Sequence, residues 1–349
     1  MRVKAIIVVI AACLAMPAAP ARAAKPPEPL FAGDTLIHLT LKGPLAALRK
    51  SRSGVQAPLP GALSVQGSAP EILPVALSLR GITRRKQDVC SFPPLRLAFA
   101  DKPPEGSLFK GQKRLKLVTH CQPAEGFQQY VLLEYAAYQM YALLTPLSMR
   151  ARLAMIDYQD DTGRPVTTRL GFLIEDDSDV ARRNGLARFK GSDRARLDQL
   201  SGRDAARFAL FEYLIGNLDW SMTAGPPGDG CCHNAKLLGA EDATTGLVPV
   251  PYDFDFAGLV DPPYATPPQG MSLANVRVRR YRGYCAHNAQ AQAAVADLLT
   301  RRAALLAVID QTPQLTAKSR QTAAAYLGEA FDQIANPQQF AKVLQTCLG

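Results

Sequence analysis

The sequence predicts an α+β protein of two unequal lobes, an antiparallel β-rich lobe followed by a mainly helical one. Two observations carry this prediction. Up to about residue 175, short alternating or β-favouring segments dominate, and a single stretch of helical length interrupts them. Beyond residue 176, apolar residues recur at helical spacing. We therefore expect a leader at 1–23, an N-terminal lobe at 24–175 and a C-terminal lobe at 176–349.

The first lobe is expected to be an antiparallel sheet with one main helix. Its strands are predicted at 36–41, 75–79, 95–99, 113–120 and 151–156, and 51–60 is expected to be a loop. The helix is predicted at 128–144, where Tyr130, Glu134, Ala137 and Tyr141 fall on one stripe and Glu134 is the only acidic residue. A strand at 171–175 that runs into four residues rich in aspartate is the expected hinge.

The second lobe is expected to consist mostly of helices. They are predicted at 204–215, 291–309, 316–334 and 337–348. The last of them has a clear start, because Asn336 is a favourable N-cap and Pro337 suits the first helical position. We expect this lobe to carry the loops with the functional carboxylates.

The N-terminus has the pattern of a secretory signal peptide. Positive residues precede an apolar run from Ala5 to Met16 that is too short to span a bilayer, and Ala21-Arg22-Ala23 is a small-x-small cleavage signal. A lipoprotein box ending at Cys13 is less favoured, because the apolar run continues past it. The expected mature protein is exported, periplasmic or secreted, without a transmembrane span.

The charge of the chain favours anionic partners. Cleavage after Ala23 would remove three basic residues and no acidic one, which lowers the formal net charge from +10 to +7. Such a field attracts phosphates, acidic peptides or anionic envelope surfaces. No run of Lys and Arg resembles a nucleic-acid-binding arm, and Trp220 is the only tryptophan, so a nucleic-acid partner is not expected.

Six cysteines remain beyond the predicted leader, and an even number in an exported chain favours disulfides. Cys90 is expected to pair with Cys121, and one of Cys231 and Cys232 with Cys285. A zinc site at Cys231, Cys232 and a neighbouring histidine is disfavoured, because adjacent cysteines are poor ligand spacing compared with C-x-x-C.

Polar residues in apolar settings gather between 211 and 258. FEYLIGNLDW, CCHNAKLL and VPVPYDFDFAG place Asp219, Asn234, Asp253 and Asp255 at the ends of predicted elements. A carboxylate in such a setting needs a cation, a donor or a shifted pKa. The layout is typical of a metal-phosphate site, and Asp253 with Asp255 would equally suit a structural Ca²⁺ ion.

Phosphoryl transfer also needs a cation on the phosphates. Lys116 lies on a predicted strand and Glu134 on the helix that follows, so we expect the two to form an ion pair. Upstream, Arg80-Gly81 and the basic residues at 84–86 would either replace a phosphate-cradling loop or form a solvated basic turn.

These positions together resemble a known superfamily. Lys116, Glu134, Asp219, Asn234 and Asp253 occur in the chain order of the polar residues of protein-kinase-like proteins. More specifically, LSLRG, LIGNLDW, HNAKLL, VPYDFD and GLVDPPYA resemble bacterial proteins related to the spore coat protein H (CotH-like) kinase family, over about 77–265.

The resemblance implies a bilobal protein-kinase-like fold and a role for each position. Asp219 would be the catalytic base, and Asn234 and Asp253 would bind the metal, with Asp255 replacing or assisting Asp253. Lys116 would contact the nucleotide phosphates, paired with Glu134.

The function expected from this resemblance is that of an exported phosphotransferase. It would use Mg²⁺ or Mn²⁺ with ATP or another nucleotide to modify a hydroxyl, most simply a Ser or Thr of an envelope or secreted protein. The sequence departs from the pattern, because the segment between Asp219 and Asn234 is long and no G-x-G-x-x-G, H-R-D or D-F-G motif occurs. The alternative is an inactive kinase-fold envelope protein that binds an anionic ligand or a partner. A Ser-His-Asp hydrolase lacks its G-x-S-x-G elbow.

Overall fold

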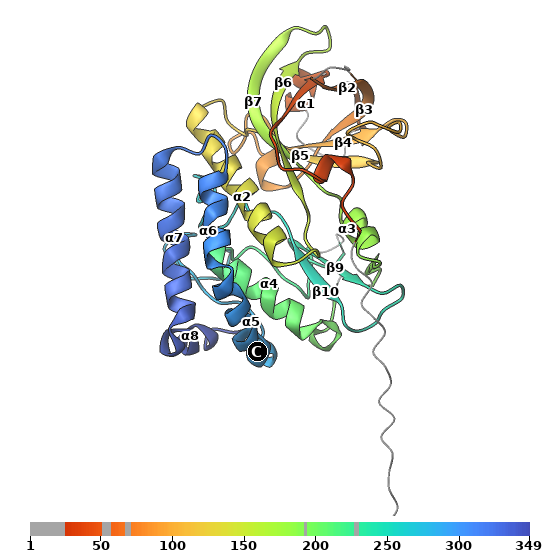
Figure 1. Cartoon of the computed structure of the whole chain (residues 1–349). Coiled ribbons are helices and arrows are strands. Elements are labelled where there is room, and N and C mark those ends of the chain that lie inside the picture. The colour runs from red at the N-terminus through yellow and green to blue at the C-terminus, as the bar shows by residue number, and fades with distance from the viewer. Residues whose placement is uncertain (1–24, 51–56, 67–70, 192–193, 227–229) are drawn as a thin grey trace, which may run out of the picture.

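The computed structural model describes residues 25–50, 57–66, 71–191, 194–226 and 230–349 (Figure 1). The predicted signal peptide at 1–23 and the lipoprotein box at Cys13 lie outside the described residues.

Seven strands close into a barrel in the order β1-β2-β3-β4-β5-β7-β6. They are β1 Ile37–Lys42, β2 Leu59–Val65, β3 Glu71–Leu79, β4 Leu95–Phe99, β5 Arg114–Val118, β6 Ala151–Gln159 and β7 Pro165–Ile174. Neighbours are antiparallel except β1 and β6, which pair in parallel and close the barrel. Inward-facing side chains such as Leu41, Leu77 and Leu97 fill its interior.

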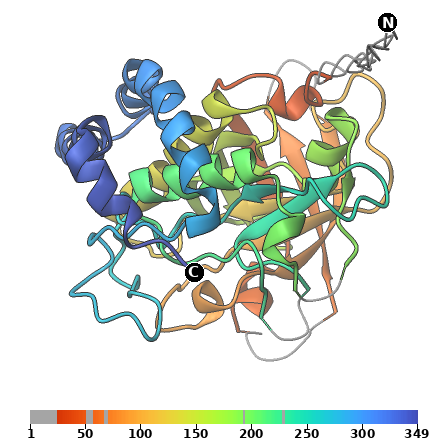
Figure 2. The ribbon, with the colours of Figure 1, turned by 90° about the horizontal axis from the view of Figure 1, so that it is seen from below.

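A second sheet and most of the helices lie below the barrel (Figures 1 and 2). The sheet has the order β10-β9-β8, with β8 Ala187–Arg188, β9 Ala235–Gly239 and β10 Val248–Pro251. The helices are α1 Leu45–Lys50, α2 Gln128–Leu144, α3 Asp177–Arg183, α4 Gly202–Ile215, α5 Asn288–Thr300, α6 Arg302–Gln311, α7 Ala317–Ala335 and α8 Pro337–Leu344. No helix in the described part of the chain is both long enough and apolar enough to cross a lipid bilayer.

The predicted bilobal kinase-like arrangement is wrong. The β-rich part is a closed seven-stranded barrel, and the fold as a whole is a mixed α+β structure with eight α-helices among the described residues. Closure depends on β2, which was not predicted because Pro60 and Gly61 interrupt its pattern, and which bridges β1 to β3. The two expected lobes are also joined, since one hydrophobic core includes Leu153 of β6, Phe172 of β7 and Phe211 of α4.

Helix α2 has the bounds that the sequence predicts, and it is buried on nearly all sides. The rings of Tyr135 and Tyr138 pack against Phe172 of β7. A helix that is apolar around its whole circumference belongs in a core. Glu134 is therefore carried into the interior, and its carboxylate needs a cationic partner.

The predicted C-terminal helices are found with changed bounds. The stretch 291–309 is two helices, because α5 ends at Thr300 and α6 begins at Arg302. Asn336 caps α8 as predicted, since its side chain accepts hydrogen bonds from the backbone N–H groups of Gln338 and Gln339.

Three disulfides connect the six described cysteines. Cys90–Cys121 is confirmed. The predicted bond from the Cys231–Cys232 segment to Cys285 is wrong, because Cys231 and Cys232 pair with each other. Cys285 pairs instead with Cys347, beside the bridge between Tyr284 and Leu348.

Candidate functional site

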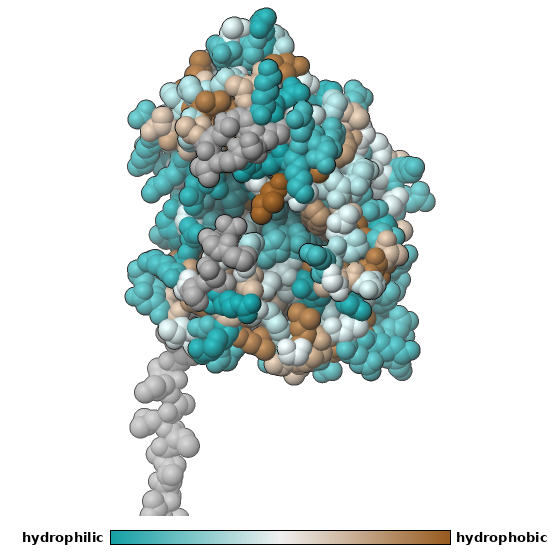
Figure 3. Space-filling view, turned by 180° about the vertical axis from the view of Figure 1, so that it is seen from behind, coloured by the Kyte–Doolittle hydropathy of each residue, from teal (hydrophilic) through white to brown (hydrophobic). Residues whose placement is uncertain are grey.

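A cleft of about 780 Å³ lies between the barrel and the loops that follow α4 and β10. Basic side chains from the barrel side, among them Arg80, Arg84 and Lys116, line it together with Asp219 and Asp253 from the other side. The face of the molecule turned away in Figure 1 is mainly hydrophilic, with small apolar patches (Figure 3). The charged side chains that line the cleft suit a polar, charged ligand.

Asp253 and Asp255 are placed by the end of strand β10. Asp253 has a left-handed backbone conformation, with φ of 66°, and its N–H donates a 2.9 Å hydrogen bond to the Tyr138 hydroxyl. Between them, Phe254 is fully buried, with its ring 4.7 Å from that of Tyr138 and 5.6 Å from that of Phe211. The buried ring holds the two carboxylates on either side of it. A left-handed non-glycine residue at a cleft is typical of a functional site.

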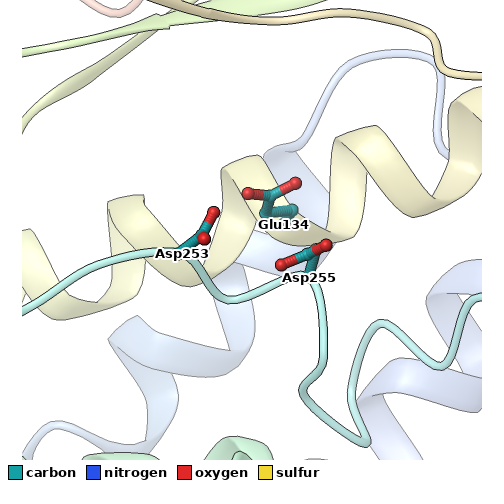
Figure 4. Close-up of side chains that lie close together, drawn as sticks. All are labelled: Glu134, Asp253 and Asp255. Atoms are coloured by element: carbon teal, nitrogen blue, oxygen red, sulfur yellow. The ribbon is translucent and has the colours of Figure 1, made fainter. Parts of the chain in front are cut away.

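Three carboxylates meet beneath the cleft. Glu134 on α2 lies beside Asp253 and Asp255, which are on the loop after β10 (Figure 4). One oxygen of each lies within 4.8 Å of the others. Carboxylate oxygens are the ligands that Mg²⁺, Mn²⁺ and Ca²⁺ prefer. We call this group the carboxylate triad.

Arg84 lies among the three carboxylates. Its Nη1 donates to Glu134 at 2.9 Å, its Nη2 to Asp253 at 3.0 Å, and its Nε lies 3.1 Å from an oxygen of Asp255. Burial disfavours the charged guanidinium, but Asp255 and Glu134 outweigh this effect and raise the pKa of Arg84 well above its usual value. A single buried cation thus pairs with all three carboxylates of the triad.

The pKa values of the triad reflect burial opposed by nearby cations. Burial raises the pKa of Asp255 to about 8, and Arg84 opposes this rise. Burial also raises the pKa of Glu134. The pKa of Asp253 is lowered, because Arg84 and Arg80 together outweigh burial. Asp253 is also the member with 27% of its side chain exposed, so it is the carboxylate most accessible to a ligand.

Lys116 does not pair with Glu134, contrary to the expectation from the sequence, because Arg84 takes that position. The ammonium group of Lys116 lies 4.9 Å from the centre of the Tyr252 ring, a cation–π contact. Burial, and then the neighbouring Arg80, lower its pKa to about 8. Lys116 remains a cation of the cleft wall, next to Arg80.

Arg80 follows β3, with a side chain that is 10% exposed. Its Nη2 lies 4.0 Å from an oxygen of Asp253. Its Nη1 is buried and has no hydrogen-bond partner among the described residues. A buried guanidinium nitrogen without an acceptor is costly, so Arg80 has hydrogen-bonding capacity to offer a ligand in the cleft that it lines.

Asp219, in the loop after α4, is held by the segment that begins β9. The Nε2 of His233 lies 2.8 Å from one carboxylate oxygen, and the Nδ2 of Asn234 donates to the other at 3.1 Å and to the backbone carbonyl of Asp219 at 2.6 Å. Asn234 has a left-handed backbone, with φ of 49°. Asn234 thus orients Asp219 toward the cleft that both residues line.

The contact between His233 and Asp219 makes stability depend on pH. The hydrogen bond to Asp219 raises the pKa of His233 above its ordinary value of 6.5. Protonated His233 therefore stabilises the fold fully below the unfolded-state pKa, and the contribution is lost as the pH rises through the folded-state pKa. We expect the melting temperature of the native protein to exceed that of His233→Gln most at about pH 6 and by progressively less as the pH rises through the raised pKa of His233. Differential scanning fluorimetry across this range checks it; a difference independent of pH would contradict it.

The structure brings most of the predicted site residues to one place. Six of them line the cleft, namely Arg80, Lys116, Asp219, Asn234, Asp253 and Asp255. Glu134 is buried beneath it and acts through Arg84. Sequence reasoning missed the central position of Arg84, although the basic run at 84–86 and the excess of carboxylates over assigned cations pointed to an unassigned partner.

Comparison with known proteins adds no family to this picture. No family model matches the sequence, and no curated protein matches it. The function is therefore argued from the geometry of the cleft.

Proposed function

We propose that this protein is an exported phosphotransferase, which moves a phosphoryl group from ATP or another nucleotide to a hydroxyl, most simply that of a Ser or Thr in an envelope or secreted protein. The proposal concerns the reaction implied by the resemblance to spore coat protein H kinases. It does not depend on the bilobal fold that the structure overturns.

One observation carries the proposal: Asp219, two carboxylates of the triad and the cations Lys116 and Arg80 line a single cleft. Asp219 lies on one side, Asp253 and Asp255 beneath, and Lys116 and Arg80 on the barrel side. Phosphoryl transfer requires this combination of positioning and charge rather than covalent partners. Each component alone is common in proteins, and their convergence from distant parts of the chain supports the reaction.

The donor atoms fit a divalent cation, because the carboxylate oxygens of the triad lie within 4.8 Å of one another. Asp253 and Asp255 would hold Mg²⁺ or Mn²⁺ with the amide oxygen of Asn234, and the ion would neutralise charge on the phosphates. Lys116 and Arg80 would bind the phosphate oxygens, since both are cations of the cleft wall.

Asp219 would accept the proton of the attacking hydroxyl. The oxygen of the acceptor forms a bond to the terminal phosphorus, the anhydride bond to the nucleoside diphosphate breaks, and the proton passes to the Asp219 carboxylate. His233 and Asn234 fix the orientation of that carboxylate.

The proposed compartment agrees with the three disulfides, which persist in oxidising environments. Little ATP is expected outside the cytoplasm, so several nucleotides belong in the test.

A second candidate is a binder of an anionic ligand or partner that transfers nothing. The observation in its favour is Arg84, which already forms ion pairs with all three carboxylates of the triad. An anion bound by Arg80 and Lys116 would then need no metal ion. The two candidates differ in whether binding depends on a metal and whether phosphate is transferred.

Asp253→Ala is expected to abolish metal-dependent stabilisation by nucleotide. A ligand at about one hundred times its Kd stabilises the native state by about 2.7 kcal/mol, which raises the melting temperature by several degrees. We expect this rise for the native protein with nucleotide and Mg²⁺ or Mn²⁺, and none for the variant. Thermal unfolding with and without EDTA measures it.

Asp261→Ala is the matched control for this experiment. Asp261 also has a left-handed backbone, with φ of 50°, and an arginine partner, Arg277 at 3.7 Å, but it does not line the cleft. Asp261→Ala should keep the full metal-dependent rise in melting temperature with nucleotide. Stabilisation of the native protein without a metal and without transfer would favour the second candidate, and no response to any nucleotide would reject the phosphotransferase.

A further inference from the structure

The side chain of Arg84 occupies the place that a metal ion would take in the triad. It is 8% exposed and pairs with Glu134, Asp253 and Asp255 at 2.9, 3.0 and 3.1 Å. A divalent ion in contact with the same oxygens would lie beside a guanidinium in a buried setting, where like charges repel strongly. Arg84 and a free divalent ion therefore compete for Asp253 and Asp255.

The cleft is already rich in positive charge without a metal, because seven Lys and Arg side chains line it against five Asp side chains. Arg80, Arg84 and Lys116 together bring as many positive charges as the three carboxylates can carry. A divalent ion that enters alone leaves an excess of positive charge in a poorly solvated cleft, which is unfavourable. A divalent ion that enters together with a multiply charged anion leaves no such excess. The negative charge of the anion compensates the positive charges of the ion and of the displaced guanidinium.

A separate feature shows where such an anion would bind. The Nη1 of Arg80 is buried without a hydrogen-bond partner among the residues that the structure describes. The same side chain lies 4.0 Å from Asp253 through its other terminal nitrogen. A phosphate bound in the cleft by the Arg80 guanidinium would give this side chain a further acceptor and would lie next to the carboxylate that Arg84 shares.

We infer that Arg84 is an internal cation that keeps a free divalent ion out of the triad, so that metal and phosphate bind only together. When both arrive, Arg84 releases Asp253 and Asp255 to the metal and donates to the phosphate, while Glu134 retains its bond to the guanidinium. This inference deepens the proposed function and rests on it for the identity of the ligand. The proposed reaction alone would not require the metal and the phosphate to bind together.

The test measures Mn²⁺ binding directly. The loss of the free Mn²⁺ signal in electron paramagnetic resonance gives the affinity of the protein with and without inorganic pyrophosphate, after correction for the Mn²⁺–pyrophosphate complex. For the native protein we expect pyrophosphate to tighten Mn²⁺ binding by about tenfold or more. For Arg84→Gln we expect Mn²⁺ alone to bind about tenfold or more tightly than it binds to the native protein, with the coupling largely lost.

Arg96→Gln is the matched control, because Arg96 lines the same cleft but is not among the arginines that pair with the triad, which are Arg80 and Arg84. It removes one positive charge and should leave the affinity for Mn²⁺ alone close to that of the native protein. If the affinity for Mn²⁺ alone rose as much in Arg96→Gln as in Arg84→Gln, the effect would come from the overall positive charge of the cleft. That result would overturn the specific role of Arg84.

Arg84→Lys covers the case in which Arg84→Gln does not fold. A lysine keeps the charge, but its single nitrogen cannot reach all three carboxylates, so the affinity for Mn²⁺ alone should rise by less than in Arg84→Gln. The coupling between Mn²⁺ binding and pyrophosphate binding is measured on the native protein, so this part of the test does not depend on a variant that folds. Tight binding of Mn²⁺ to the native protein without pyrophosphate overturns the inference.

Failure of the inference and failure of the proposed function differ in outcome. If Mn²⁺ binds the native protein tightly by itself and nucleotide-dependent transfer still occurs, only the role of Arg84 is rejected. If neither Mn²⁺, pyrophosphate nor their mixture binds, the phosphotransferase proposal and the role of Arg84 are both rejected.

Discussion

Asp219→Asn is expected to lower the rate of phosphate transfer by about 100- to 10,000-fold, the usual contribution of a general base. The substitution keeps the size of the side chain and replaces one carboxylate oxygen by an amide that cannot accept the proton. Binding should persist, because Asp253, Lys116 and Arg80 are unchanged. We therefore expect kcat to fall with little change in KM for the nucleotide.

The measurement follows radiolabelled terminal phosphate from the nucleotide to the protein itself or to a mixture of Ser- and Thr-containing proteins. Asp242→Asn is a suitable control, since Asp242 also has a left-handed backbone, with φ of 60°, on an exposed loop outside the cleft. Equal transfer by the native protein and Asp219→Asn would remove Asp219 from the chemistry. A change confined to KM would make it a binding residue.

Phe254→Ala is expected to destabilise the fold by about 3–5 kcal/mol, the usual cost of truncating a fully buried phenylalanine. The ring of Phe254 lies against Tyr138 of α2 and Phe211 of α4, and it is completely buried. Its loss leaves a cavity where the barrel side and the helical side meet. It also removes the anchor between Asp253 and Asp255, so the response to metal and nucleotide should weaken in the fraction that remains folded.

Equilibrium unfolding in urea measures the first effect, and the metal-dependent melting shift measures the second. Phe256→Ala is the matched control, because Phe256 is two residues away and half-buried, with its ring against Tyr264 at 5.7 Å. Its truncation should cost clearly less. Equal costs for the two variants would contradict the anchoring role of Phe254.

Local features of this protein were readable from the sequence. Helix α2 was predicted with its observed bounds, because its composition favours a helix over its whole length. The position of Asp253 and Asp255 at the end of an extended segment followed from the two X-Pro pairs before them. Both predictions rest on interactions between residues close in sequence.

Barrel closure and the partner of Glu134 were not readable, because both depend on contacts between distant segments. The closing pair of β1 and β6 joins Ile37 to Ala154, and no local pattern specifies that register. Either Lys116 or Arg84 could have formed the ion pair with Glu134. The turn after β3 places Arg84 there, and its conformation could not be predicted from the local sequence. The sequence identified the charged residues of the site but could not assign their pairs.

The parallel pairing of β1 with β6 also leaves the barrel without a strand edge. Because the barrel is closed, none of its seven strands offers a row of unpaired backbone N–H and C=O groups to another chain. Removal of Ile37–Lys42 would create two such edges at once, on β2 and on β6. A truncation at this point would thus turn a closed barrel wall into a template for intermolecular β-sheet and aggregation.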